Sequence, residues 1–132
     1  MKRLLASVLL VVATANVFAQ EKEDVILTSH KNFLSRYDSR KDEWVAEEII
    51  RSTIKFKFTD DYVMASDESK SLYRIVENFP SKKYDDKEVI KARCLDEQNR
   101  DCYILLVDYD DSRIDPIIIV LYKNTMLTYV ID

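Results

Sequence analysis

The sequence of 132 residues contains no glycine, one histidine and two cysteines. Average usage would place about nine glycines in a chain of this length. Gly-rich phosphate loops, the dinucleotide-binding fingerprint and the Gly-x-Ser-x-Gly nucleophile elbow are therefore excluded, because each needs a residue without Cβ beside a ligand or at a strained turn. The single histidine, His30, excludes any site that is built on two imidazoles.

Few other residues indicate catalysis. Ser29 precedes His30 directly, and neighbouring residues on a strand point to opposite faces, so this serine and this histidine do not form a nucleophile–base pair. The chain has 24 acidic residues, but no spacing singles out two carboxylates for glycoside chemistry. We therefore expect neither enzymatic activity nor a cofactor.

The first nineteen residues have the pattern of an export signal. A basic start is followed by an apolar run over residues 4–15, and Val17 and Ala19 are small residues at the positions that a signal peptidase inspects. The apolar segment is shorter than the roughly 20 residues that span a bilayer. We expect cleavage after Ala19, one domain over residues 20–132 in the periplasm or outside the cell, and no stable membrane span.

The expected mature chain is acidic. Removal of the signal leaves 18 Lys and Arg against 24 Asp and Glu, a net charge of −6. An acidic surface with scattered basic residues repels phosphate backbones, so we expect no binding to nucleic acid. A basic protein is a partner that this charge allows.

Short runs with a two-residue period alternate with polar turns along the rest of the chain. In Ile54–Phe58 the three apolar side chains point one way and the two lysines the other, as in a half-exposed antiparallel strand. The expected strands are Val25–Ser29, Phe33–Asp38, Trp44–Glu48, Ile54–Phe58, Tyr62–Ser66, Ser71–Val76, Val89–Leu95, Cys102–Tyr109, Pro116–Tyr122 and Met126–Ile131. Such a succession predicts an all-β fold, an antiparallel meander that forms a small barrel or sandwich.

Residues 43–51 leave an alternative open. Trp44, Glu47 and Arg51 fit helical spacing as well as strand spacing, and the Glu-Glu-Ile-Ile segment has good helix propensity. The fold would then be α+β, with one short helix packed on an antiparallel sheet.

The turns must reach positive φ angles without glycine. Asn and Asp tolerate the left-handed region best among the other residues. The predicted turns are supplied with them, as Asp60-Asp61, Gln98-Asn99, Asp110-Asp111 and Lys123-Asn124. We therefore interpret these acidic pairs as turn residues rather than as catalytic carboxylates.

The two cysteines predict a disulfide. Cys94 ends one expected strand, Cys102 begins the next, and the midpoint of their numbers falls in the polar turn between them. Residues directly opposite in an antiparallel hairpin have Cα separations of about 4.5 to 5.5 Å, which suit the bond. Export to an oxidising compartment favours a bond between Cys94 and Cys102.

An acidic segment near residue 110 is the only indication of a metal. Asp108, Asp110 and Ser112 have the spacing that begins an EF-hand loop, but Arg113 replaces the required glycine and Ile119 the required glutamate. We expect no metal site, with a non-standard calcium site on Asp108, Asp110 and Asp115 as the alternative.

The C-terminal strands are apolar on both faces. A strand of this kind must be covered on both sides, and one face of it can pack into the core. The other face requires intramolecular cover, a bound apolar ligand or a second subunit. The residues that we expect on a ligand-binding or dimer face are Leu106, Ile118, Val120 and Val130.

Taken together, these features predict an exported, non-catalytic binding domain. In the first hypothesis the domain binds a small apolar molecule in a cavity of a β-barrel. In the alternative it is an acidic protein-interaction module, such as an inhibitor or immunity-type partner of a basic protein. A homodimer is compatible with both.

Overall fold

The computed structural model describes residues 25–132, and the predicted signal segment, residues 1–19, lies outside this range. The described residues form ten β-strands and no helix. The strands are β1 (Val25–Asp38), β2 (Glu43–Ile50), β3 (Ile54–Phe58), β4 (Tyr62–Ser66), β5 (Lys70–Asn78), β6 (Lys82–Lys83), β7 (Lys87–Leu95), β8 (Asp101–Tyr109), β9 (Ile117–Leu121) and β10 (Thr125–Ile131). Residues 25–132 thus contain no helix of the length and hydrophobicity that crossing a membrane requires.

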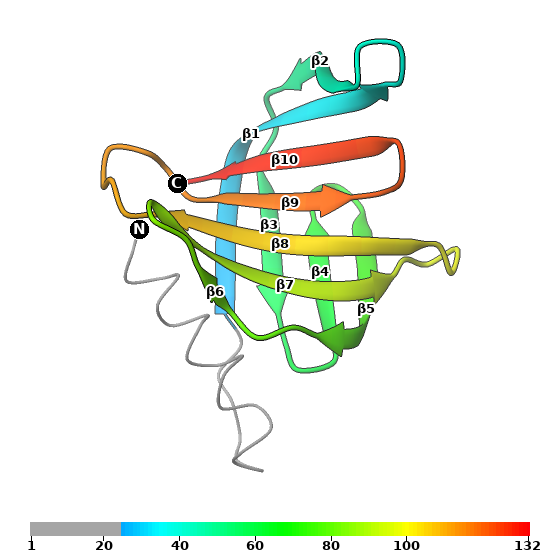
Figure 1. Cartoon of the computed structure of the whole chain (residues 1–132). Helices are drawn as coiled ribbons and strands as arrows, with labels where there is room; N and C mark the ends of the chain where they lie inside the picture. Colours follow the sequence, from blue (N-terminus) through cyan, green and yellow to red (C-terminus); the bar gives the residue numbers. More distant parts are fainter. Residues whose placement is uncertain (1–24) are drawn as a thin grey trace.

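Eight of the strands close into an antiparallel barrel. Its order is β1-β3-β4-β5-β7-β8-β9-β10, and β10 pairs back onto β1 (Figure 1). Each barrel strand lies beside the next one in the chain, apart from the two extra strands β2 and β6. The predicted all-β meander is confirmed, as a barrel.

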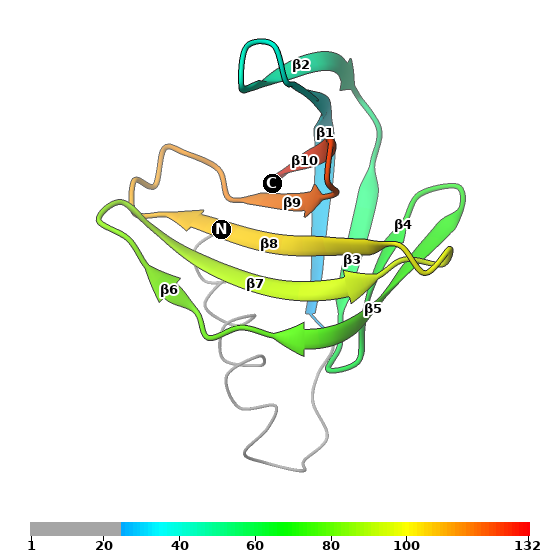
Figure 2. The same ribbon diagram turned by 45° about the vertical axis from the view of Figure 1, so that its right-hand side comes forward.

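β1 is long enough to form part of the barrel wall and also to extend beyond it. Its first residues, Val25–Ser29, pair with β3, and residues 32–38 pair with β2 along the same edge. The opposite edge of β1 pairs with β10. Figures 1 and 2 show the β1–β2 hairpin projecting beyond the barrel wall.

The helical alternative for residues 43–51 is wrong. Residues 43–50 form β2, and a register shift between Leu34 and Ser35 of β1 accommodates an extra residue of β2 as a bulge. Trp44, Val45 and Ile49 are aromatic or β-branched and suit a strand. Pairing with β1 outweighs the helix propensity of the glutamates, because tertiary contacts override a weak local preference.

The barrel interior is filled by alternate side chains from every barrel strand. Phe56 is completely buried and meets Tyr129 edge to face, with ring centroids 4.7 Å apart. The other buried apolar residues of this core are Leu27, Phe58, Val63, Tyr73, Ile90, Ala92, Cys94, Cys102, Ile104, Leu106, Ile118, Val120 and Ile131. Eight strands make a barrel whose interior side chains can fill it, as they do here.

Two residues of the described chain have positive φ. Asn99, in the β7–β8 turn, has φ 59°, and Asp42, just before β2, has φ 52°. Asn99 confirms that a predicted turn pair supplies a left-handed residue in place of glycine. The pairs Asp60-Asp61, Asp110-Asp111 and Lys123-Asn124 also lie between strands, with negative φ.

Candidate functional site

A hollow of about 340 Å³ lies between the β1–β2 hairpin and the outer surface of β8 and β9. Its main apolar side chains are Trp44 of β2, Tyr103 of β8 and Leu121 of β9. Asp101, Cys102, Tyr122 and Lys123 complete the lining. We call this hollow the Trp44 pocket.

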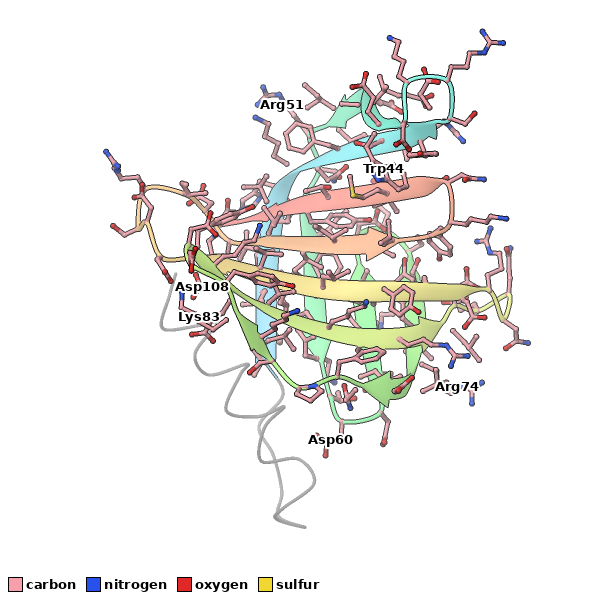
Figure 3. All side chains as sticks on the ribbon, in the orientation of Figure 1. Trp44, Arg51, Asp60, Arg74, Lys83 and Asp108 are labelled. Atoms are coloured by element: carbon pink, nitrogen blue, oxygen red, sulfur yellow. The ribbon has the colours of Figure 1, made fainter. Side chains whose placement is uncertain are left out.

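The strand register explains how residues distant in sequence meet there. Tyr103 and Leu121 are direct cross-strand partners, so their side chains lie side by side on one face of the sheet. Trp44 is paired with Tyr37, and their rings contact edge to face at 5.5 Å. Figure 3 shows the Trp44 side chain pointing from the hairpin toward β10. Trp44 remains 37% exposed, which leaves part of its ring open to a ligand.

The outer face of β8 and β9 continues the apolar surface beyond the pocket. Leu105 pairs with Ile119, and Val107 pairs with Ile117, on the same face as Tyr103 and Leu121. Except for Val107, these side chains are only partly buried. The second apolar face expected for the C-terminal strands is therefore the outside of the barrel.

The four residues predicted for a ligand or dimer face divide between the two sides of the wall. Leu106, Ile118 and Val120 point inward and are 4%, 0% and 0% exposed. Val130 is paired with Ile117 and lies on the outer side. The structure therefore does not bring these four side chains together on one surface.

A smaller polar hollow of about 190 Å³ adjoins the Trp44 pocket and shares Tyr122 with it. Its central group is Asp96, which is 9% exposed and follows β7. One carboxylate oxygen accepts hydrogen bonds from the backbone N–H groups of Gln98 and Arg100, both at 2.9 Å. The other accepts from Arg100 Nε and from the Tyr122 hydroxyl, both at 2.8 Å.

Burial and these hydrogen bonds determine the pKa values of Asp96, Tyr122 and Tyr73. Burial alone would raise the pKa of Asp96, but the hydrogen bonds from Arg100, Tyr122 and Gln98 outweigh it, and the pKa is lowered. Burial and the bond to Asp96 raise the pKa of Tyr122, and burial raises that of Tyr73 to about 12. At neutral pH the Asp96 carboxylate is ionised and both of its oxygens accept hydrogen bonds, whereas the phenols of Tyr122 and Tyr73 are protonated. This arrangement suits holding the β7–β8 turn rather than proton transfer.

The predicted disulfide is not present in the structure. Cys94 and Cys102 are direct cross-strand partners, as the sequence predicted, but both are buried free cysteines. Register fixes the Cα positions only, and the bond also requires both side chains to adopt rotamers that join the sulfurs. Burial raises the pKa of the Cys94 thiol to about 12 and that of Cys102 to about 11.

The acidic segment near residue 110 has other contacts. Asp110 forms an ion pair with Lys83 at 2.6 Å, and Figure 3 shows Lys83 and Asp108 at the end of the barrel away from Trp44. Among residues 25–132 no three His, Cys, Asp or Glu side chains are grouped as metal ligands would be. Asp108, Asp110 and Asp115 therefore do not form such a group.

His30 has two partners that sequence reasoning missed. Its Nδ1 lies 2.8 Å from the Thr53 hydroxyl, and its Nε2 lies 2.8 Å from Asp132. Hydroxyl, imidazole and carboxylate are connected in the order used by nucleophilic triads. However, the side chains of His30 and Asp132 are both more than half exposed, and none of the hollows described above includes these residues. Ser29 is fully buried and His30 is exposed, so the two side chains point to opposite faces of β1, as their adjacency predicted.

Comparisons with known proteins do not assign this chain to a family. No family model, curated protein or solved structure matches the chain significantly.

Proposed function

We propose that the protein is an exported, non-catalytic binding domain that takes a small apolar ligand in the Trp44 pocket. The pocket volume of about 340 Å³ carries the proposal, together with its apolar walls of Trp44, Tyr103 and Leu121. A volume of this size lies at the lower end of the range for small-molecule sites. The ligand would bind outside the barrel, because aromatic and branched side chains fill the interior.

Trp44 is the only tryptophan of the chain, so its fluorescence reports on this pocket alone. Titration with a homologous series of straight-chain alcohols should shift the emission to shorter wavelength and saturate. Affinity should rise with chain length until the pocket is full, by about 0.8 kcal/mol for each buried methylene group. No change up to the solubility limit of any alcohol would refute the proposal.

Leu121→Glu should abolish the saturable shift, because it places a charge in the apolar wall of the pocket. Ile26→Ser is the matched control, since Ile26 is 55% exposed and belongs to β1 away from the pocket. Equal titration curves for Leu121→Glu and Ile26→Ser would assign the fluorescence change to another surface.

An interaction domain for a basic protein is the second candidate function. It is supported by β2, an outermost strand in which all three charged residues are glutamates. The net charge of the chain, −4, favours approach of such a partner over long distances.

A further inference from the structure

We propose that the free edge of β2 accepts an extended segment of a partner protein in which basic and apolar residues alternate. The segment would extend the sheet by one strand, through backbone hydrogen bonds to β2. This inference rests on the second candidate function and does not require ligand binding in the Trp44 pocket.

The edge of β2 is open among the described residues. β2 ends the strand order and pairs with β1 alone. The Tyr37 N–H donates to Asn124 O at 3.1 Å, on the side of β1 away from β2. Tyr37 and Trp44 are therefore a pair that exchanges no hydrogen bonds, and the backbone N–H and C=O of Trp44 and Ala46 point to the open edge.

The register also sorts the β2 side chains into two faces. Trp44, Ala46 and Ile49 lie on the face shared with Tyr37, Ser35 and Phe33. Glu43, Val45 and Glu48 lie on the other face, opposite Asp38, Arg36 and Leu34. One face of the edge is therefore apolar, with Ile49 58% exposed, and the other carries the acidic groups.

The charges on the acidic face of β2 favour a partner strand that carries basic residues. Glu47, at the bulge, is paired with Arg36 at 2.7 Å. Glu43 and Glu48 are exposed and form no ion pair within residues 25–132. An added strand with Lys or Arg at alternate positions would place cations beside these glutamates and apolar side chains beside Trp44 and Ile49.

A second copy of the chain fits this edge less well. Two β2 strands paired antiparallel would bring three glutamates from each copy into one small region of sheet. Like charges across paired strands are destabilising, and charged side chains on edges are a common protection against self-association. The observations therefore favour a basic segment of a different protein.

The test uses an acetylated heptapeptide of alternating Lys and Val as the probe, with calorimetry of the folded protein as the readout. We expect saturable one-to-one binding that weakens in high salt. Ala46→Pro should weaken the affinity by about tenfold or more, because proline removes an N–H that faces the partner and leaves the pairing with β1 intact. Ala46→Ser, which keeps the N–H, is the matched control and should bind as the wild type does.

A charge swap provides a second test that does not depend on proline. The variant with Glu43→Lys and Glu48→Lys should no longer bind the Lys-Val peptide and should bind an alternating Glu-Val peptide instead. Equal binding of both peptides to the wild type would overturn the inference, as would unchanged affinity in folded Ala46→Pro. A wild-type dimer that Ala46→Pro converts to a monomer would assign the edge to a second copy. The alcohol titration should be unaffected in Ala46→Pro, so failure of the two proposals is distinguishable.

Discussion

Asp96 shows how a single residue organises one end of the barrel. Its carboxylate holds the β7–β8 turn through two backbone N–H groups and ties that turn to Tyr122, which follows β9. The positive φ of Asn99 was predictable, because a glycine-free turn requires an Asn or Asp there. The bond from Tyr122 was not predictable, since the partner lies 26 residues away in the sequence.

Replacement of Asp96 should give a pH-dependent loss of stability. At pH 7 Asp96→Asn should lower the free energy of unfolding by about 1–3 kcal/mol, because it removes the charge from a buried hydrogen-bonded group. The folded-state pKa of Asp96 is lowered, so its contribution is present above the unfolded value of about 3.9 and is lost as the pH falls through the folded value. Urea unfolding of the variant and the wild type should therefore converge in acid.

Asp67→Asn is the control for this prediction. Asp67 accepts a hydrogen bond from the Ser69 N–H at 2.8 Å in an exposed turn. Its substitution should change stability by less than about 0.5 kcal/mol, as is usual for exposed positions. An Asp96→Asn difference that stays constant down to pH 2 would show that the charge of Asp96 does not contribute.

The two cysteines should be unreactive in the folded protein. With pKa values raised to about 12 for Cys94 and about 11 for Cys102, the thiolate fraction at pH 8 is lower than in a free cysteine by a factor of about a hundred or more. Iodoacetamide should label neither residue in the native state and both in denaturant without reductant, as measured by intact mass. Absence of label in the denatured protein would mean that the disulfide forms.

At the scale of elements, β9 shows what the sequence pattern could and could not predict. The run Ile117–Leu121 is apolar at every position, which correctly indicates a strand with two apolar faces. A strand with polar residues on one side, such as β3, reveals its inner face, but β9 offers no such contrast. The choice of Ile118 and Val120 for a binding face therefore had no support in the local pattern, and both belong to the core.

Adjacent residues of β9 should respond very differently to the same substitution. Ile118→Asp buries an unpaired carboxylate in the filled interior and should destabilise by about 5 kcal/mol or more, which is enough to unfold a domain at the lower end of the usual stability range of about 5–15 kcal/mol. Ile119→Asp, on the partly exposed outer face, should remain folded. Circular dichroism and thermal unfolding of the two purified variants measure this. A folded Ile118→Asp would show that the interior has room for water or a ligand.

At the scale of the whole molecule, closure of the barrel depends on partners at opposite ends of the described chain. Leu34 pairs with Leu127, and Phe33 pairs with Thr128, across more than ninety residues. Hairpins could be predicted one at a time because each is local. Closure and the Trp44 pocket could not, because they depend on the curvature of the whole sheet and on where the β1–β2 hairpin comes to lie.

Closure also determines how stability is distributed, and amide hydrogen exchange should reveal it. Both edges of β9 are paired, with β8 and with β10, so its amides should open only with global unfolding. β2 has one paired edge, and protection should alternate along it: the Val45 N–H faces β1, whereas those of Trp44 and Ala46 face solvent. Residue-resolved NMR exchange should find Trp44 and Ala46 at least about a hundredfold faster than Val45. If the N–H groups of Trp44 and Ala46 were as protected as that of Val45, the edge would already be covered in solution, and a partner strand could bind only by displacing that cover.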